Sequence, residues 1–228
     1  MPTAIVTGAS RGLGLALARA LAERGWRLVI DAREPVALQD AAAELARATD
    51  VAALPGDVAD AEHRRGLLAA AGPRVDLLVN NASLLGPSPQ PLLADYPLDV
   101  LEHVYRVNVL APLALIQLAL PQLPAGARIV NVTSDAAVEP YEGWGGYGSA
   151  KAALDHLSAI LAVERADLRV YAVDPGDMNT RMQQEAFPGE DISDRPPPEA
   201  SVPGLLALVE GDLPSGRYQA RALAEAPA

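Results

Sequence analysis

The N-terminal segment of the chain has the sequence Thr3-Ala-Ile-Val-Thr-Gly8-Ala-Ser-Arg-Gly12-Leu-Gly14-Leu-Ala-Leu-Ala-Arg-Ala-Leu-Ala22. An apolar run with strand character meets three glycines, and a strongly helix-forming run follows at once. Glycines at such a turn let the backbone approach a pyrophosphate, and the helix N-terminus supplies N–H donors and the positive end of a dipole. The stretch therefore predicts a strand–turn–helix dinucleotide site, with the spacing Gly-x-x-x-Gly-x-Gly.

Beyond this stretch, apolar strand-like runs alternate with Ala/Leu-rich helical runs along the chain. Strands are expected near residues 3–7, 27–31, 51–54, 75–80, 128–133 and 169–173, and helices near 12–24, 35–48, 60–71, 98–122 and 147–166. This alternation predicts an α/β fold with a Rossmann-type doubly wound parallel sheet in three layers, α/β/α. We expect one domain over residues 1–228, with an irregular loop at 188–203, where proline, acidic residues and glycine are concentrated.

The composition restricts the possible functions. The 228 residues are 50% apolar, which suffices for one sizeable α/β core. A net charge of −11 argues against nucleic acid or an anionic membrane as a partner. The absence of cysteine excludes disulfides and thiolate chemistry. His63, His103 and His156 have no neighbours at metal-ligand spacing, so no metal site is expected.

The termini and hydropathy suggest a location. No apolar run is expected to approach the ~20 residues of a membrane span. The first predicted strand begins at the N-terminus and leaves no room for a signal peptide. A cytoplasmic protein is therefore expected.

A second constellation lies at residues 131–151, where Asn131-Val-Thr-Ser134 is followed by a glycine-rich loop and by Tyr147-Gly-Ser-Ala-Lys151. On a helix, the spacing of Tyr147 and Lys151 puts both side chains on one face. A cation held close to a tyrosine lowers its pKa from about 10, which suits a general acid or base. Ser134, at the end of an apolar strand, could hydrogen-bond the same substrate oxygen. Alternatively, the pair is ordinary helix surface.

Together with the glycine turn, Ser134, Tyr147 and Lys151 resemble the short-chain dehydrogenase/reductase family, over about residues 3–180. The resemblance implies reversible hydride transfer between NADP(H) and a carbonyl/alcohol pair. It implies that Tyr147 protonates the substrate oxygen, that Ser134 stabilises the oxyanion, and that Lys151 holds the nicotinamide ribose and depresses the tyrosine pKa. Asn108 matches a family asparagine that holds a water connecting the lysine to solvent.

The resemblance also implies a set of cofactor contacts. In relatives an Asp-Val pair contacts the adenine, and a threonine after a Pro-Gly turn meets the nicotinamide carboxamide. Asp57 could instead simply cap a helix. Ser83 departs from the family pattern Asn-Asn-Ala-Gly, and a slightly reshaped loop is expected there because serine tolerates positive φ less well than glycine. The expected cofactor-binding residues are Gly8, Ser10, Arg11, Gly12, Leu13, Gly14, Arg33, Asp57, Val58, Asn81, Ala82, Tyr147, Lys151, Pro175, Gly176 and Thr180.

The end of the second strand bears on the choice of nucleotide. An acidic residue there selects NAD, whereas a nearby arginine accommodates the extra phosphate of NADP. Asp31 falls one place early for the NAD-type acid, and Arg33 falls where NADP-dependent relatives carry an arginine. Arg11 adds a second guanidinium suited to a dianion. NADP(H) is favoured over NAD(H); the alternatives are an NAD-dependent alcohol dehydrogenase and a non-catalytic NADPH-binding regulator.

Residues 177–203 should form a mobile substrate loop. Apolar residues in it and in the loop before Tyr147 suggest a pocket for an aliphatic or aromatic carbonyl, or else they pack the loop against the domain. They are Met178, Met182 and Phe187, with Val138, Tyr141 and Trp144. A small-molecule carbonyl or alcohol substrate is thus expected.

The helix at 152–166 is apolar on more than one side, and in relatives it pairs with the Asn108 helix across a dimer interface. We expect a homo-oligomer, a dimer rather than a tetramer. Residues 215–219 could form a seventh strand, but the tail 220–228 lacks the Gly-Gly end with which relatives build a tetramer.

Overall fold

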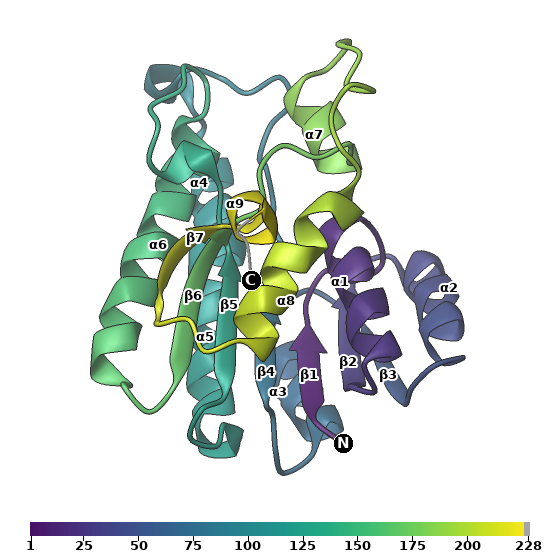
Figure 1. The fold of residues 1–228 in the computed structure, drawn as a ribbon. Coiled ribbons are helices and arrows are strands. Elements are labelled where there is room, and N and C mark those ends of the chain that lie inside the picture. Colours follow the sequence, from purple (N-terminus) through teal and green to yellow (C-terminus); the bar gives the residue numbers. More distant parts are fainter. Residues whose placement is uncertain (226–228) are drawn as a thin grey trace.

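The computed structural model describes residues 1–225, which fold around one seven-stranded parallel sheet (Figure 1). The strand order is β3-β2-β1-β4-β5-β6-β7, which confirms the doubly wound Rossmann-type architecture. The strands are β1 (Thr3–Val6), β2 (Arg27–Ala32), β3 (Val51–Pro55), β4 (Leu77–Asn80), β5 (Arg128–Val132), β6 (Arg169–Asp174) and β7 (Gly216–Gln219). The seventh strand lies within the segment that the sequence marked as its candidate.

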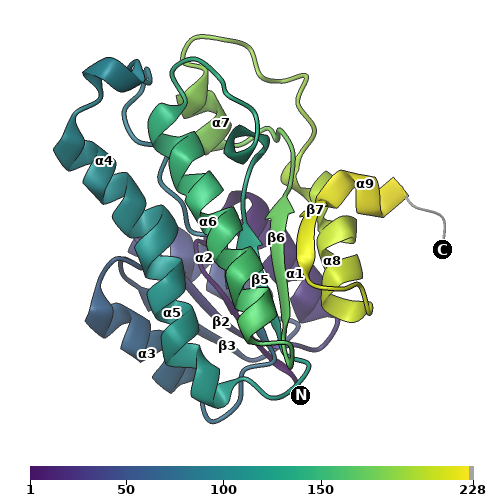
Figure 2. The ribbon, with the colours of Figure 1, turned by 90° about the vertical axis from the view of Figure 1, so that its left-hand side faces the viewer.

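Helices cover both faces of the sheet (Figure 2). Those packed against one face include α1 and α8, and those on the other include α3 and α5. The α-helices are α1 (Gly12–Glu23), α2 (Pro35–Leu45), α3 (Ala61–Ala71), α4 (Leu98–Tyr105), α5 (Ala111–Ala119), α6 (Gly145–Glu164), α7 (Arg181–Ala186), α8 (Val202–Glu210) and α9 (Ala220–Glu225). The end of the 220–228 tail, residues 226–228, lies outside the described residues.

The core divides at the sheet because successive strand residues point to opposite faces. In β1, Ala4 and Val6 join the apolar cluster under α1 and α8, whereas Ile5 joins the cluster under α3 and α5. Both β1 and β4 are buried along their whole length. Strands covered on both faces have continuous apolar sequences, which explains why the positions of these strands could be predicted from the sequence.

The helical run Leu98–Gln122 corrects one expectation. Its 25 residues reach a mean hydropathy of 1.4 over an 18-residue window, so by length and composition alone it could cross a membrane. In the folded chain half of that window is buried. The run contacts α3 and α6, so it serves as a helix of the outer layer. A π-helical turn, Arg106–Leu110, interrupts it between α4 and α5.

The proline-rich segment is irregular as predicted, apart from a short 3₁₀ turn at Pro198–Ser201 and its last two residues, which begin α8. The sequence did not indicate α7, which lies before this segment and over the carboxyl ends of the strands (Figure 1). Thr180 caps this helix, because its hydroxyl accepts from the N–H of Gln183 at 3.3 Å. Two other short helices, α8 and α9, were also not predicted.

Candidate active site

One cavity of about 600 Å³ opens at the carboxyl ends of the strands, below α7. Ligands of open α/β sheets bind at this edge, where the strand order reverses. The cavity brings together most of the expected cofactor contacts. Its lining includes Gly8, Ser10, Arg11, Gly12, Leu13, Arg33, Asp57, Val58, Asn81, Ala82, Tyr147, Lys151, Pro175 and Thr180.

The glycine turn has the geometry of a phosphate cradle. Gly8 and Gly12 adopt φ of +66° and +56°, in the left-handed region that glycine tolerates best. A Cβ at Gly14 would lie 2.5 Å from the Gly8 carbonyl oxygen, so this glycine permits close packing of α1 on the turn and does not line the cavity. Within residues 1–225 no side chain caps α1, which leaves its first N–H groups available to an anion.

Tyr147 and Lys151 lie one turn apart on α6 and both line the cavity. Lys151 is 2% exposed, and its Nζ donates to the carbonyl oxygen of Val132 at 2.7 Å. The same nitrogen lies 5.4 Å from the centroid of the Tyr147 ring. This arrangement confirms the shared face predicted from the spacing.

The pKa values of this pair differ from the expectation. Burial lowers the pKa of Lys151 to about 8. Burial also raises the pKa of Tyr147, and a hydrogen bond with Ser83 offsets only part of that rise. The prediction that the lysine depresses the tyrosine pKa is therefore wrong for this geometry. The physical reason is that desolvation dominates, while the ammonium group is bonded to Val132.

Ser134 lies just beyond β5, as predicted, but its hydroxyl is engaged locally. It donates to Asp135 Oδ1 at 2.9 Å and accepts from the N–H of Ala136 at 3.2 Å. Among the described residues that line the cavity, Ser134 is not present. Arg217 on β7 donates to the Ser134 carbonyl at 2.9 Å and to Asp155 Oδ2 at 2.9 Å, and so braces this segment.

Asn108 lies in the π-helical turn and holds the segment that follows β4. Its Oδ1 accepts from the Leu84 N–H at 2.8 Å and from Ser83 Oγ at 3.1 Å, and its Nδ2 donates to the Leu84 carbonyl at 2.8 Å. Asn108 is buried and does not line the cavity in the described structure. Such π turns recur at functional sites. Its role in proton relay stays a prediction.

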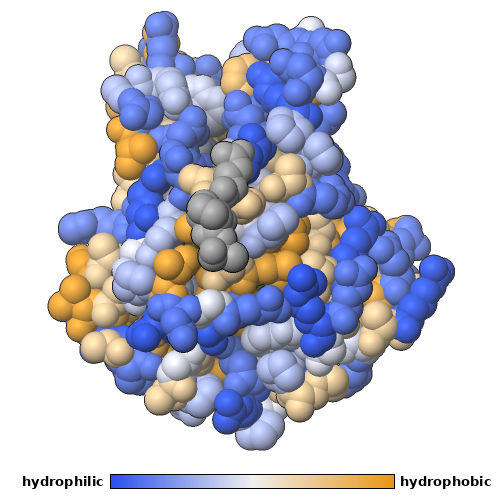
Figure 3. Space-filling view, in the orientation of Figure 1, coloured by the Kyte–Doolittle hydropathy of each residue, from blue (hydrophilic) through white to orange (hydrophobic). Residues whose placement is uncertain are grey.

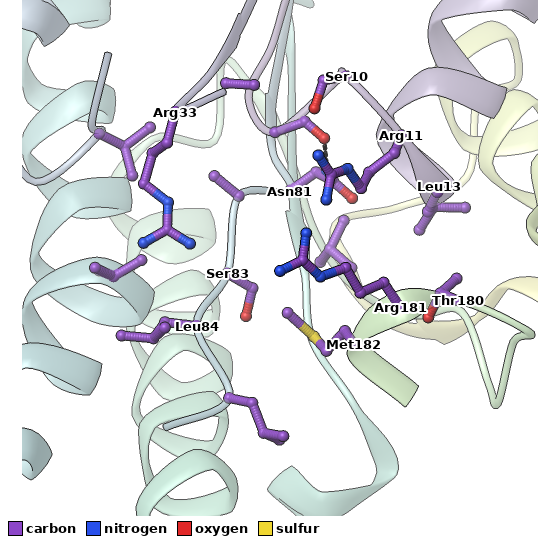
Figure 4. Close-up of a pocket in the computed structure, with 18 of the residues that line it drawn as sticks. Ser10, Arg11, Leu13, Arg33, Asn81, Ser83, Leu84, Thr180, Arg181 and Met182 are labelled. Atoms are coloured by element: carbon purple, nitrogen blue, oxygen red, sulfur yellow. Dashed lines mark hydrogen bonds between the residues drawn. The ribbon is translucent and has the colours of Figure 1, made fainter. Parts of the chain in front are cut away.

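Ser83 replaces the family glycine without backbone strain. No non-glycine residue among residues 1–225 has a positive φ, so the reshaping expected there is not required. Its side chain lies in the cavity (Figure 4) and is hydrogen-bonded both to Asn108 and to Tyr147. The sequence marked Ser83 as a departure but did not indicate this contact with the tyrosine.

At the nucleotide end, Asp31 is 1% exposed, and protein donors engage both of its carboxylate oxygens. Its Oδ1 accepts from the Gly8 N–H at 2.7 Å, and its Oδ2 lies 2.9 Å from His63 Nε2. The sequence indicated no role for His63. No local sequence pattern could have indicated a role for His63, because its contact with Asp31 joins the end of β2 to the first turn of α3.

Three arginines surround this end of the cavity (Figure 4). Arg11 and Arg33 were expected there, and Arg33 is exposed. Arg181, from α7, was not expected. Arg11 and Arg181 both pair with Glu34, the latter through Nη1 at 3.2 Å. Their bonds hold the pKa of Glu34 below its usual range.

The remaining expected residues take different positions. Met178 and Met182 line the cavity together with Leu84 and Leu85. Trp144 instead packs against other aromatic rings. Its ring centroid lies 5.9 Å from the centroids of Tyr147 and Phe187 and 6.4 Å from that of Tyr141. Within the described lining Val138, Tyr141, Trp144 and Phe187 are absent. The packing alternative holds for Trp144 and Phe187, whereas Val138 and Tyr141 are exposed at 57% and 46% and neither line the cavity nor pack the loop against the domain. Gly176, at φ +73°, forms the turn after Pro175 and also does not line the cavity.

Comparison with known proteins agrees with this geometry. The family model described as short chain dehydrogenase matches residues 2–191. The rhamnolipids biosynthesis 3-oxoacyl-(acyl-carrier-protein) reductase of Pseudomonas aeruginosa is 34% identical, over 94% of this chain and 82% of the relative. Sepiapterin reductase of Xenopus laevis is 35% identical, over 80% of this chain and 75% of the relative.

A solved structure is similar over its whole length. An alcohol dehydrogenase from the archaeon Thermococcus sibiricus, in complex with 5-hydroxy-NADP, superposes with a TM-score of 0.86 at 28% identity. The match covers 100% of this chain and 99% of that one. The chain belongs to the short-chain dehydrogenase/reductase family, whose members are oxidoreductases acting on CH–OH and C=O groups.

Proposed function

We propose that the protein is an NADP(H)-dependent oxidoreductase that interconverts a ketone or aldehyde and the corresponding alcohol. The observation that carries the NADP preference is the state of Asp31, whose two oxygens accept from Gly8 and His63. A carboxylate that is 1% exposed and already accepts two hydrogen bonds from the protein is poorly placed to receive ribose hydroxyls. Arg11, Arg33 and Arg181 supply the positive charge that a 2′-phosphate requires (Figure 4).

The residues present fit this cofactor. The left-handed glycines and the uncapped start of α1 suit the pyrophosphate, while Asp57 and Val58 line the wall expected to meet the adenine. Thr180 lies on the lining at the expected nicotinamide end. When bound, NADP(H) supplies or accepts the hydride.

The protein's own groups handle the proton. Tyr147 gives its hydroxyl proton to the substrate oxygen during reduction, and the raised pKa keeps that proton in place until it is needed. Lys151 stays charged at neutral pH, because its pKa of about 8 lies above that range. Ser134 hydrogen-bonds the same substrate oxygen once its hydroxyl leaves Asp135.

The substrate portion of the cavity favours an apolar carbonyl compound. Met178, Met182, Leu84 and Leu85 contribute four apolar side chains to the lining. Methionine is flexible and fills irregular gaps, so such a wall accepts either an aliphatic or an aromatic group.

An NAD-dependent alcohol dehydrogenase is the second candidate, because Asp31 still borders the cavity and Glu34 pairs with two of the three arginines. The proposal is tested by following NADPH and NADH oxidation in parallel over a panel of aldehydes, ketones and quinones. Turnover with NADPH supports it. Turnover with NADH alone favours the second candidate, and tight NADPH binding without turnover favours a non-catalytic regulator.

The Tyr147→Phe variant tests the site itself. Loss of the positioned proton donor should lower kcat by about 10²–10⁴-fold. Fluorescence titration should show that NADPH still binds, since the ring and Lys151 remain. Activity within a few-fold of the wild type would refute the assignment of Tyr147.

The homodimer remains our proposal, as does the cytoplasmic location. Two exposed apolar residues, Ile160 and Val163, lie on the outer side of α6, and Leu110 and Leu118 lie near or on α5. Hydrophobic residues gather over α6 at the left edge of Figure 3. Sedimentation velocity of the wild type and of Val163→Glu tests whether this face joins two copies.

A further inference from the structure

The nucleotide end of the cavity contains an electrostatic conflict. Asp31 lines the cavity at the place where the proposed cofactor carries its extra phosphate. A carboxylate beside a phosphate repels it, and the shielding by water is weak there because Asp31 is almost fully buried. A site that accepts the phosphate must therefore keep this carboxylate compensated and turned away.

His63 is placed to provide that compensation. It stands in the first turn of α3 with its side chain 8% exposed, and its Nε2 lies 2.9 Å from Asp31 Oδ2. An ionised carboxylate only accepts hydrogen bonds, so Nε2 carries the proton and donates it. This contact takes the one oxygen that the Gly8 N–H leaves free.

The backbone next to His63 is shaped to admit the ring. A Cβ at Gly56, just beyond β3, would come within 2.2 Å of His63 Nδ1. The imidazole therefore packs directly on this glycine, which fixes the direction of its Nε2. The pair is thus built from the ends of two strands and the start of one helix.

We propose that His63 is a specificity-determining residue, which holds Asp31 against the glycine turn and so makes the site accept the phosphorylated nucleotide. This inference rests on the proposed NADP(H) preference. Without His63, Oδ2 of Asp31 becomes free to accept from a ribose hydroxyl, and its charge is no longer offset. The preference should then move toward NAD(H).

The test measures cofactor binding directly, by fluorescence titration of the purified protein with NADPH and with NADH. The His63→Ala variant should raise the ratio of NADH to NADPH affinity by roughly tenfold or more, the range expected for one hydrogen bond to a charged group. His63→Phe keeps a flat ring over Gly56 without the donor, and should act in the same way if the alanine variant folds poorly. The exposed His103→Ala is the matched control and should leave the ratio unchanged.

Repeating the His63 substitution in the Asp31→Asn protein shows whether His63 acts by compensating the Asp31 charge or by packing. In Asp31→Asn, the additional change His63→Ala should leave the affinity ratio nearly unchanged, because no carboxylate remains to be released. An equal shift in both backgrounds would mean that His63 acts through packing, and would overturn the inference. So would a ratio within twofold of the wild type in both single variants of His63.

The outcomes also separate this inference from the proposed function. If the wild type binds NADH more tightly than NADPH, the proposed preference fails, while a shift in His63→Ala that depends on Asp31 still supports the role of the pair. If the wild type binds NADPH and His63→Ala changes nothing, only the inference fails. Binding of neither nucleotide would overturn both.

Discussion

Replacing Lys151 with methionine is expected to stabilise the protein against unfolding while abolishing turnover. Lys151 is 2% exposed, and burial lowers its pKa from an ordinary 10.5 to about 8. At about 1.4 kcal/mol per pKa unit, this difference corresponds to a destabilisation of about 3 kcal/mol when the lysine is charged. Methionine matches the apolar stem and has no charge, but it loses the bond from the charged ammonium to Val132, which costs about 2 kcal/mol. The net gain at pH 7 is about 1 kcal/mol.

The difference in unfolding free energy between Lys151→Met and the wild type should depend on pH in a characteristic way. Below about pH 8 the lysine is protonated in both the folded and the unfolded chain, so the full penalty applies. Between about 8 and 10.5 the unfolded chain binds a proton that the folded chain has lost, and wild-type stability rises with pH relative to the variant. The advantage of Lys151→Met should therefore be constant below about pH 8 and shrink toward pH 10.5.

Urea unfolding of both proteins at several pH values between 7 and 10, without cofactor, measures this difference. Leu154→Met on the same helix is the control, because it changes a buried side chain without any charge and should show no such pH dependence. Because burial raises the pKa of Tyr147, this residue lowers stability as the pH approaches 10, but it does so in both proteins and cancels in their difference. A variant no more stable than the wild type at pH 7, or a gap that does not change with pH, would refute the reasoning.

Two further substitutions test how the catalytic groups are held. Ser83→Gly removes the hydrogen bond that lowers the pKa of Tyr147, so the pH at which alcohol oxidation reaches half its maximal rate should rise; an unshifted profile would contradict the contact. Arg217→Gln removes the donor to the Ser134 carbonyl and should lower kcat by about tenfold or more with little change in KM for the cofactor, as steady-state kinetics would show. Wild-type kcat in a folded Arg217→Gln protein would mean that β7 does not position this segment.

The fold was predictable largely because five of the seven strands, β1, β2, β4, β5 and β6, are mostly buried. Buried parallel strands such as β1 and β4 read as continuous apolar runs, and the helices between them follow a different periodicity. Six strands were located in this way. Short helices such as α7 gave no such signal, since 6 residues are too few to show an amphipathic pattern.

The candidate site was predictable where it depends on local spacing. Tyr147 and Lys151 share a helix face because they are four residues apart, and the glycine turn follows directly from a strand. The sequence did not predict the contacts made between distant segments. The Asp31–His63 pair spans 32 positions and the Arg181–Glu34 pair spans 147, and only the tertiary fold brings these residues together.

The predicted direction of the shift in the Tyr147 pKa was wrong for a related reason. Spacing shows that a cation is near, but not how much water the fold removes from the phenol. Here burial is the largest influence on Tyr147 and also on Lys151, and it favours the uncharged form of each. A pattern of residues can therefore identify an acid–base pair while leaving the sign of its pKa shifts to tertiary structure.

Lys151 is the only lysine in the sequence, and every other strong base is an arginine. Arginine serves well where the chain needs a permanent charge on an exposed surface, as in the pairs of Arg11 and Arg181 with Glu34. Lysine differs at position 151 because its ammonium is a compact charge on a flexible stem, and it reaches the carbonyl of Val132 from an almost fully buried position. At this buried position next to Tyr147, desolvation lowers the pKa of that cation to about 8. The stability lost by burying that cation is thus tied to the one position where the proposed chemistry requires it.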